Sequence, residues 1–535
     1  METLGSGAMT NDFVSIQSAD VMLVIGSNTT ESHPVIGSFI KERKERGGKL
    51  IVCDPRQIEM SKHADIAIQQ RSGTDIALLN GMMHVIIQEG LYNAQFVAER
   101  VENFDALKEL VAQYTPEKVS EITGVPASLI IEAARLYAKG PNSAIFYTMG
   151  ITQHICGTSN VRSIANLALI CGMFGRPGTG VNPLRGQNNV QGACDMGCVP
   201  TWVPGYQRHH VPEVQAKVRE IWGHELPMSP GKTVVRMTDA AEAGQIKALY
   251  IIGENPMVSD PNTNHVRRAL HNLDFLVVQD IFLTETAQLA DVVFPAACWV
   301  EKDGTFTNTC RAVQRVRKVV QAPGEAKPDW QILTLLAQHC GTNWTYQSAE
   351  EIFQEICRFV PSYHGITYAK LDNAPIHWPC PTEDHPGTPI LHTTKFPRAS
   401  GKAKVVPCEW QKPHEWPDQE FPYLGITGRI LYHYHSGSMT RRSAPKDFIP
   451  ELFIEISPED ATQLQVTPTS MIKVTSRRGS IEGKVKITER VPKQAIFIPF
   501  HFSEAPANAL TASQIDPVSE TPAYKINAVK IEKIS

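Results

Sequence analysis

Val21-Met-Leu-Val-Ile-Gly-Ser-Asn28 decides the fold of this chain, because an apolar run ends at a glycine that is followed by small polar residues. Five consecutive apolar residues predict a strand buried on both faces, which is typical of a parallel sheet covered by helices. In doubly wound folds, a glycine turn after the first strand admits a nucleotide phosphate near a helix N-terminus. The stretch therefore predicts the start of a nucleotide-binding α/β unit.

The residues that follow fit the same unit. A helical stretch leads to a second strand, Leu50–Cys53, which ends in Asp54, and Ala64-Asp65 precedes a third short strand, Ile66–Ile68. An acid at the end of the second strand is placed to accept a hydrogen bond from a ribose hydroxyl or a base edge. No G-x-G-x-x-G motif is present, so one such unit alone is a weak signal for nucleotide binding.

The same series of features returns later in the chain. A strand with a glycine turn, a second strand with an acid, and an Ala-Asp pair before a third strand occupy Leu249–Pro256, Phe275–Asp280 and Ala290–Phe294. The glycine and the acid are 28 positions apart in the first series (Gly26 and Asp54) and 27 in the second (Gly253 and Asp280). The repetition predicts two related units that hold two nucleotide-like ligands, or one ligand with two such arms. Chance similarity among α/β segments is the alternative.

Helices are predicted between the two units, where apolar residues recur at helical spacing over 75–89, 93–114, 128–139 and 161–174. Gly150–Gln153 is predicted to be a polar strand end after the strand Ala144–Tyr147. The proline-rich region 321–422 indicates an irregular connector, and short alternating runs after Phe421 predict a small β-barrel or sandwich. The predicted fold class is α/β: two related doubly wound units plus a small C-terminal β-barrel domain.

The composition excludes several functions. A net charge of −4 gives no polybasic surface for nucleic acid or an anionic membrane, and no apolar stretch is long enough for a transmembrane helix. The eleven cysteines include no C-x-x-C pair and are odd in number, so we expect reduced thiols in the cytoplasm. Cys194 with Cys198, and His433 with His435, have spacings that a metal could use. Neither pair has a further ligand, so we expect no metal site formed by this chain alone.

The segment Arg176–Gly197 is the strongest functional signal. It gathers five side-chain amides around Arg185, and these are Asn182, Gln187, Asn188, Asn189 and Gln191. A buried amide without partners costs about 1–3 kcal/mol, so these groups need water or a polar ligand. A guanidinium among amides suits a small planar anion such as a carboxylate, which it can bind through two parallel hydrogen bonds. An exposed loop that forms its own Asx turns is the alternative.

Three segments together resemble the molybdopterin oxidoreductase family, and within it the catalytic (alpha) subunit of molybdenum- or tungsten-dependent formate dehydrogenase. They are Cys53–Arg56, Val278–Phe282 and Gly180–Gly197, and the resemblance extends from Gly5 to Ile534. It implies two molybdopterin guanine dinucleotides with one metal between them, which accounts for the two predicted units. The expected domains are 1–187 and 188–420, both α/β and dinucleotide-binding, and the β-barrel 421–535, which also contacts the dinucleotide.

The resemblance also implies roles for single residues. Arg185 corresponds to the arginine that orients formate, with Gln187 beside it. One dinucleotide site is implied to contain Gly26, Asn28, Cys53, Asp54, Arg56, Gly73 and Asp75. The other is implied to contain Gly253, Glu254, Asn255, Gln279, Asp280 and Asp329. The C-terminal domain is implied to contribute His433, Tyr434, Ser436, Asn508 and Lys525, whereas at His435 the family more often has a small hydroxyl residue.

The family pattern is incomplete in this sequence. The resemblance implies an N-terminal domain with a 4Fe-4S cluster, a lysine that relays electrons, and a Cys-His or selenocysteine-His pair that binds the metal. None of these is in the sequence. We expect that Met1 is a restart after a selenocysteine codon read as a stop, that the natural enzyme is longer, and that this chain alone is inactive.

The complete enzyme is expected to oxidise formate to carbon dioxide. Its two electrons would pass to partner subunits, such as an iron–sulfur protein, ferredoxin, a NAD-reducing subunit or a hydrogenase. Two alternatives stay open: a non-catalytic, cofactor-binding fragment or subunit completed by another chain, and a related oxidoreductase such as a nitrate reductase. Molybdenum and tungsten both fit the resemblance.

Overall fold

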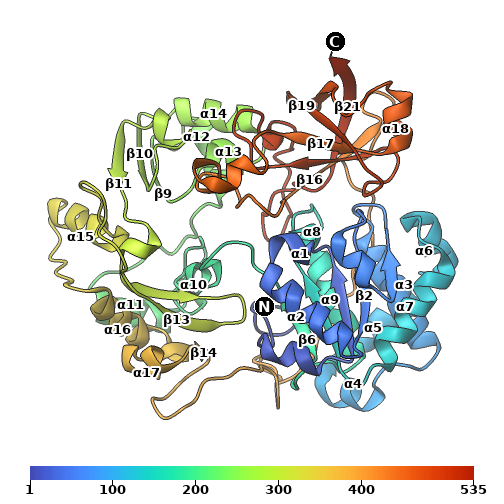
Figure 1. The fold of residues 1–535 in the computed structure, drawn as a ribbon. Helices are drawn as coiled ribbons and strands as arrows, with labels where there is room; N and C mark the ends of the chain where they lie inside the picture. Colours follow the sequence, from blue (N-terminus) through green and yellow to red (C-terminus); the bar gives the residue numbers. More distant parts are fainter. Residues whose placement is uncertain (535) are drawn as a thin grey trace. The chain divides into compact units, whose positions relative to one another are not determined.

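A computed structural model describes residues 1–534, which form two compact units (Figure 1). The first unit contains Met1–Gly186, Asp260–Asn264 and Ile390–Ser535, and the second contains Gln187–Ser259 and His265–Pro389. No helix within residues 1–534 is long and apolar enough to cross a bilayer. Within the same range, no pair of cysteines forms a disulfide.

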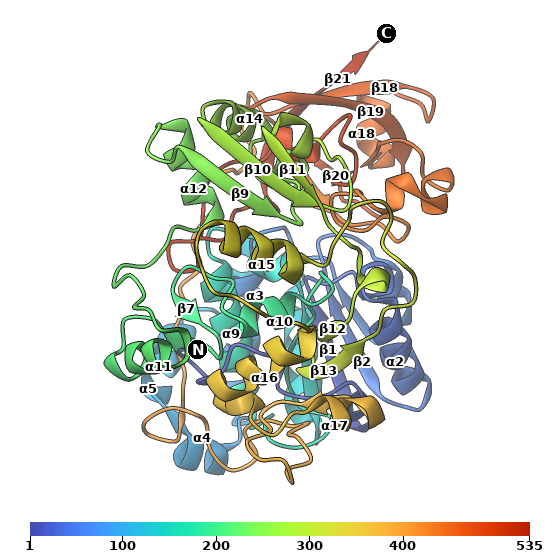
Figure 2. The same cartoon turned by 90° about the vertical axis from the view of Figure 1, so that its left-hand side faces the viewer.

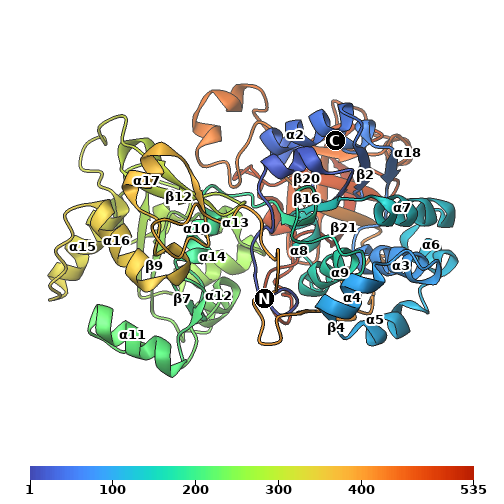
Figure 3. The same ribbon diagram turned by 90° about the horizontal axis from the view of Figure 1, so that it is seen from below.

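The first unit is built on a five-stranded parallel sheet in the order β3-β2-β1-β5-β6. These strands are β1 (Val21–Ile25), β2 (Lys49–Cys53), β3 (Ile66–Ile68), β5 (Ser143–Tyr147) and β6 (Gly180–Pro183). Figure 3 shows α2 (Pro34–Glu45) on one side of the sheet, and α3 (Asp75–Gln88), α7 (Ala127–Lys139) and α9 (Gly157–Ile170) on the other. Because both faces are covered, every residue of β1 is at most 3% exposed. The predicted doubly wound unit is confirmed.

Shorter elements complete this part of the first unit, and two of them correct the predictions. The predicted helix 93–114 is interrupted: α4 (Ala94–Arg100) ends where β4 (Val101–Glu102) pairs with β15 (Ala403–Lys404), and α5 (Phe104–Val111) follows. A strand partner so far away in the sequence leaves no local signal. Residues 149–152 form helix α8 (Met149–Thr152) rather than a strand end. The remaining elements are η1 (Val14–Ser18), α1 (Thr29–Ser32), η2 (Glu59–His63) and α6 (Pro116–Thr123).

The C-terminal region of the first unit is a closed barrel, as the alternating runs predicted. Its strand order is β16-β20-β17-β19-β18-β21. The strands are β16 (Tyr423–Gly428), β17 (Phe453–Ile456), β18 (Met471–Thr475), β19 (Ser480–Ile487), β20 (Ala495–Pro499) and β21 (Asn527–Ile534). In β19 the burial alternates along the strand, which places apolar side chains in the barrel and charged ones outside. The connections contain η6 (Thr440–Arg442), η7 (Ala444–Asp447), α18 (Pro458–Gln463) and η8 (Ala507–Ala509).

The second unit contains a smaller parallel sheet in the order β11-β10-β9. Its strands are β9 (Ala248–Ile252), β10 (Phe275–Asp280) and β11 (Val292–Pro295), and Figure 2 shows them side by side, with α12 (Val234–Glu242) and α14 (Thr263–His271) beside the sheet. Across this sheet the strands lie in the reverse of their order along the chain, as β3, β2 and β1 do in the first sheet. The predicted duplication therefore extends to strand order, although only three strands are repeated.

The rest of the second unit corrects the prediction of an irregular connector. Three helices lie in the region 321–422, and these are α15 (Asp329–His339), α16 (Ala349–Phe359) and α17 (Tyr368–Asn373). The sequence held a signal for α16, because Ser348 accepts a hydrogen bond from the Glu351 N–H as an N-cap. The other elements are α10 (Val190–Asp195), β7 (Trp202–Val203), β8 (Gln207–Arg208), α11 (Pro212–Trp222), α13 (Pro256–Ser259), η3 (Ala287–Leu289), η4 (Trp299–Glu301), β12 (Gly304–Thr307), β13 (Ala312–Val316), η5 (Pro361–Tyr363) and β14 (Ile376–His377).

Candidate cofactor and substrate site

The two glycine turns have the same backbone geometry. The Gly26 N–H donates to the Cys53 carbonyl at 2.9 Å, and the Gly253 N–H donates to the Gln279 carbonyl at 2.8 Å. Both glycines have positive φ, 56° and 64°. A Cβ at Gly26 would lie 2.9 Å from the Gly150 carbonyl carbon, so a side chain has no room there. Each turn therefore joins the end of the first strand of its series to the end of the second.

The predicted acids also occupy equivalent positions. Asp54 accepts from the Arg56 N–H at 2.9 Å, and Asp280 accepts from the Phe282 N–H at 3.1 Å. The Ala-Asp pairs match as well, because Asp65 accepts from the N–H at the second residue of β2 (2.8 Å) and Asp291 from the equivalent N–H of β10 (2.7 Å). The two series therefore share equivalent hydrogen bonds as well as equivalent residues. Chance similarity between α/β segments does not explain this agreement.

Several buried polar atoms surround the first turn without partners. Both amide atoms of Asn28, the Thr30 hydroxyl, Nδ1 of His33 and Nε2 of His435 have no hydrogen-bond partner among residues 1–534. An unsatisfied buried polar group costs about 1–3 kcal/mol, and native structures contain few of them. Arg429 lies near both histidines, with its guanidinium 4.9 Å from the centre of the Tyr434 ring. The Asn28 amide, the Thr30 hydroxyl and the Arg429 cation fit the phosphates of a bound dinucleotide.

Asp54, Asp75 and Lys525 form a charged group behind this turn. Burial raises the pKa of Asp54 and of Asp75 to about 6. Burial lowers the pKa of Lys525 to about 8, although the charge of Asp54 opposes that shift. The Lys525 ammonium donates to the Thr427 carbonyl at 2.9 Å, and Gln70 donates to Asp75 at 3.1 Å. Carboxylates in such a site can accept the ring and amino N–H groups of a guanine base.

Two other predicted residues of the first unit have largely structural contacts. Arg56 forms a buried ion pair with Glu455 of β17 at 2.7 Å, and its guanidinium lies 3.4 Å from the centre of the Phe497 ring. It therefore connects the loop after β2 to the barrel. A Cβ at Gly73 would lie 2.4 Å from the Ile526 side chain, so the close packing there requires glycine.

The C-terminal residues His433 and His435 do not lie on a strand, because they belong to an irregular segment between β16 and η6. Both ring nitrogens of His433 are engaged, with the Thr440 hydroxyl at 3.3 Å and the Ile449 carbonyl at 2.8 Å. His435 has a positive φ of 46°, which separates its direction from that of His433. Ser436 bonds Ser438 at 3.0 Å, and Asn508 is buried in η8. Sequence periodicity missed this because the segment is irregular.

In the second unit, the predicted residues Gln279 and Asp329 form one polar network. The Gln279 side chain is fully buried, accepts from the Tyr250 hydroxyl, and donates to Asp329 at 2.7 Å. Asp329 also pairs with Lys302. Tyr250 could have been found as the one hydroxyl-bearing residue in the middle of an apolar strand, whereas nothing in the sequence pattern marks Lys302. Asn255 is buried nearby on the glycine turn, donates to Glu285 at 2.7 Å and accepts from Thr286 at 2.7 Å.

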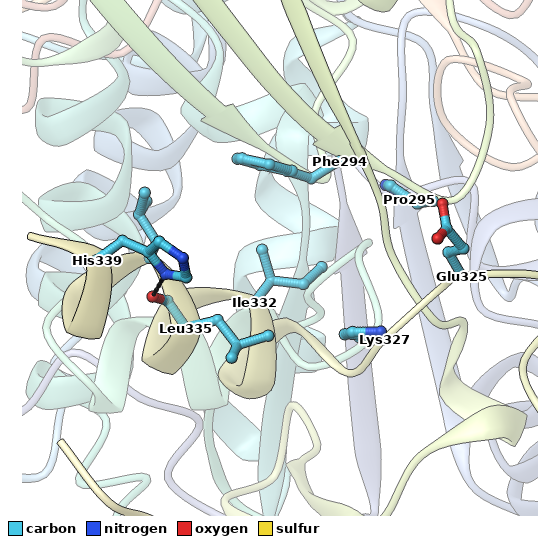
Figure 4. Close-up of a pocket in the computed structure, with 8 residues that line it drawn as sticks. Phe294, Pro295, Glu325, Lys327, Ile332, Leu335 and His339 are labelled. Carbon is cyan, nitrogen blue, oxygen red and sulfur yellow. Dashed lines mark hydrogen bonds between the residues drawn. The ribbon is translucent and has the colours of Figure 1, made fainter.

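A cavity of about 490 Å³ lies beside this network (Figure 4). Its walls are largely apolar, and Figure 4 shows Ile332 and Leu335 of α15 facing Phe294 of β11. Lys327 and Glu325 are its charged lining residues. The cavity is lined by four residues of α15, the helix that begins at Asp329 of the polar network: Ile332, Leu335, Leu336 and His339.

Arg185 follows β6 in the first unit. The Leu184 N–H donates to the Tyr147 carbonyl of β5 at 2.9 Å, which fixes the chain just before Arg185. The Arg185 carbonyl accepts from Nε2 of His33 at 2.8 Å, and its guanidinium lies 3.5 Å from the Gly7 carbonyl. Gln187 is exposed and belongs to the second unit.

The amides near Arg185 have different environments. Asn182 is buried inside the first unit, and Gln191 is buried in the second, where it donates to Asp195 at 2.8 Å. Asn189 accepts from the Thr307 N–H at 2.9 Å. Gln187 and Asn188 are exposed. Of the five amides, two are therefore buried, one is half-buried and two are exposed, and Arg185 itself is half-buried.

Comparisons with known proteins agree with this geometry. Residues 2–339 match the family model "Molybdopterin oxidoreductase", and residues 423–528 match "Molydopterin dinucleotide binding domain". The chain is 50% identical to F420-dependent formate dehydrogenase subunit alpha of Methanocaldococcus jannaschii, over 99% of this chain and 79% of that protein. It is 39% identical to formate dehydrogenase H of Escherichia coli, over 100% of this chain and 76% of that protein.

A solved structure supports the fold. Acetylene hydratase from Pelobacter acetylenicus superimposes with a TM-score of 0.79 at 22% identity, over 99% of this chain and 80% of that chain. At this identity the similarity concerns architecture alone. Since the family model covers more than half of the sequence and close relatives match it along nearly its whole length, the chain belongs to the molybdopterin oxidoreductase family.

Proposed function

We propose that this chain is the cofactor- and substrate-holding part of a formate dehydrogenase catalytic subunit. The observation that carries the proposal is the 50% identity with a formate dehydrogenase alpha subunit over 99% of the chain, combined with an arginine held at the end of β6. Two F420-dependent formate dehydrogenase alpha subunits of Methanococcus maripaludis are each 48% identical to the chain. The proposed net reaction converts formate to carbon dioxide, one proton and two electrons.

The residues present fit two molybdopterin guanine dinucleotides. The Asn28 amide and the Thr30 hydroxyl near Gly26 would bind phosphate, and Asp54, Asp75 and Lys525 would contact the guanine end. Gly253, Glu254, Asn255, Gln279, Asp280 and Asp329 would hold the second dinucleotide, and His433, Tyr434, Ser436 and Asn508 would complete the first. When bound, the cofactor supplies a molybdenum or tungsten centre that accepts two electrons.

Arg185 would bind and orient the substrate. Its guanidinium can donate two parallel hydrogen bonds to the two oxygens of formate, which leaves the C–H bond directed away from the arginine. Fixing this direction lowers the entropic part of the activation free energy, since formate has few other groups that a protein can bind. Gln187 would act only as a neighbour, because its side chain is exposed.

The domain boundaries 1–187, 188–420 and 421–535, a cytoplasmic location and an electron-accepting partner subunit are further parts of the proposal. Among residues 1–534, no three His, Cys, Asp or Glu side chains are grouped to hold a metal. An iron–sulfur cluster and a protein ligand to the metal would come from other polypeptide sequence. This agrees with the longer relatives, of which the chain covers 76–79%.

Guanine nucleotide content tests the cofactor assignment. We expect two guanine nucleotides to be released per purified chain, and Asp54→Asn and Asp280→Asn each to lose one. Asp105→Asn, on the exposed face of α5, is the matched control and should retain both.

Formate-dependent reduction of a viologen dye by the complex isolated from its native host tests the reaction. Folded protein without guanine nucleotide, or a complex that reduces nitrate and ignores formate, would overturn the respective assignment.

A further inference from the structure

The peptide between Arg185 and Gly186 is contacted by two histidines that sequence reasoning did not select. Nε2 of His33 lies 2.8 Å from the Arg185 carbonyl oxygen. The ring of His435 lies against Gly186, where a Cβ would be 3.0 Å from its Cε1 atom. All four residues belong to the first unit. The backbone at Arg185 is thus bonded on one side and sterically confined on the other.

The direction of the His33 ring is itself fixed by the local sequence. His33 separates α1 from α2, and its N–H donates to the Thr29 carbonyl at 2.9 Å. Pro34 occupies the first position of α2, and a following proline restricts the backbone of the residue before it. The ring therefore projects from a rigid junction between two helices, which is a suitable support for a positioning contact.

The hydrogen bond also fixes the tautomer of His33. A carbonyl oxygen can only accept, so Nε2 carries the proton and donates. Nδ1 is buried and has no partner in the described part of the chain. Burial lowers the pKa of His33 below its usual value. The hydrogen bond to the Arg185 carbonyl opposes this shift and the charge of Arg429 adds to it, so the ring is neutral near pH 7.

We propose that His33 positions Arg185, by holding its carbonyl oxygen so that the guanidinium is aimed at the substrate, while His435 prevents the Gly186 backbone from moving away. The expected effect of this positioning on formate turnover rests on the proposed function, whereas the contact of His33 with the Arg185 backbone does not. An arginine side chain rotates about several bonds, so its aim depends on where its Cα is held. A displacement of about 1 Å can reduce a rate by about a hundredfold.

Hydrogen–deuterium exchange of the 535-residue protein tests the positioning directly. In His33→Ala, we expect amides of the peptide 182–189 to exchange at least about threefold faster, because the Arg185 carbonyl loses its donor. His33→Gln should restore protection, because a glutamine amide can donate from nearly the same place. The control is His84→Ala, which removes a similar bond, from His84 Nδ1 to the Val111 carbonyl at 2.9 Å, and should leave 182–189 unchanged. Unchanged exchange of 182–189 in His33→Ala would overturn the inference.

Kinetics of the native complex provide the second test. His33→Ala should raise the KM for formate about tenfold with a smaller change in kcat, and His33→Gln should return it to within about threefold of wild type. Guanine nucleotide content should stay at the wild-type level, and its loss in His33→Ala would instead assign His33 to cofactor binding and refute the positioning role. A wild-type complex inactive with formate would refute the proposed function, while the exchange experiment would still decide the role of His33.

Discussion

Burial controls the ionisation of single residues around the first glycine turn. It lowers the pKa of His154 and of His435 to about 4 and of His501 to about 3, and it raises the pKa of Asp54 and Asp75 to about 6. His501 shows why a neutral ring is needed. Its Nδ1 donates to the His435 carbonyl at 2.5 Å, while its Nε2 accepts from the Ile430 N–H at 3.1 Å. A protonated ring could not accept the second bond.

A dependence of stability on pH follows from His501. Its pKa is lower in the folded protein, so its stabilising contribution is complete above about pH 6.5 and is lost as the pH falls toward 3. The free energy of unfolding should decrease by up to about 1.4 kcal/mol per pH unit for this one proton. The raised pKa values of the two aspartates act oppositely: their contribution is lost as the pH rises from about 4 to about 6.

Urea unfolding at several pH values between 7 and 4 measures this effect. His501→Gln should show a shallower decline than wild type, because the variant lacks the titrating group. His364→Gln, at an exposed histidine, should follow the wild-type curve. Equal slopes for His501→Gln and wild type would contradict the assignment.

Arg185 supports a second prediction at the residue scale. Arg185→Lys should reduce kcat/KM for formate by at least about a hundredfold, because one ammonium cannot reproduce two parallel hydrogen bonds to a carboxylate. Guanine nucleotide content should not change, since the substitution does not touch the predicted dinucleotide residues. Arg135→Lys, on the exposed surface of α7, is the control. Turnover of formate at the wild-type rate would remove Arg185 from the proposed site.

At the scale of elements, the first unit depends on contacts between its sheet and its barrel. The buried pair of Arg56 and Glu455 joins the loop after β2 to β17, and Arg490 reaches from the barrel to Glu31 on α1 at 2.7 Å. Charges buried in this way stabilise little when both are present, but removal of one leaves the other uncompensated. The loop that bears Asp54 is therefore placed in part by the barrel.

Replacement of Glu455 tests this connection. Glu455→Gln should lower the free energy of unfolding by about 3–5 kcal/mol, because the Arg56 guanidinium would stay buried without its counter-charge. Chemical denaturation is the measurement, and the double variant Arg56→Met/Glu455→Leu should recover part of the loss. Glu89→Gln breaks the exposed pair with Arg135 and should change the stability little. A Glu455→Gln variant as stable as the Glu89→Gln variant would contradict this account.

At the scale of the whole molecule, the two units have separate cores. The second unit is organised around Asp195, which is 1% exposed and accepts four hydrogen bonds. The donors are Gln191 (2.8 Å), Tyr206 (2.9 Å), Tyr363 (2.6 Å) and Trp378 (2.8 Å). All of them belong to the second unit, so the loss of this carboxylate should act there first.

The Asp195→Ala variant tests this separation. It should leave four buried donors without their acceptor, which costs at least about 3 kcal/mol. Limited proteolysis should then cut the second unit between 187 and 389 sooner than in wild type, whereas peptides from β1 and β2 keep their protection from hydrogen exchange. Asp239→Ala on α12, a half-exposed position, is the control. Simultaneous loss of protection in both units would show that they unfold together.

The sequence by itself determined the strands of both sheets except β6, together with their glycine turns and their acids. These features depend on residues close together in the chain, where apolar runs and fixed spacings act directly on the backbone. The same reasoning explains why the duplication and the barrel strands were predictable. The break in helix 93–114 was not, because it depends on pairing between β4 and β15.

Only the tertiary structure decided which distant residues meet. His33 and Arg185 are 152 positions apart, Arg56 and Glu455 are 399 apart, and Asp195 and Trp378 are 183 apart. No local periodicity specifies such pairs, since they form when the sheet and barrel close around shared polar groups. The sequence therefore predicted Arg185 as an anion-binding residue, and the fold decided what contacts its backbone.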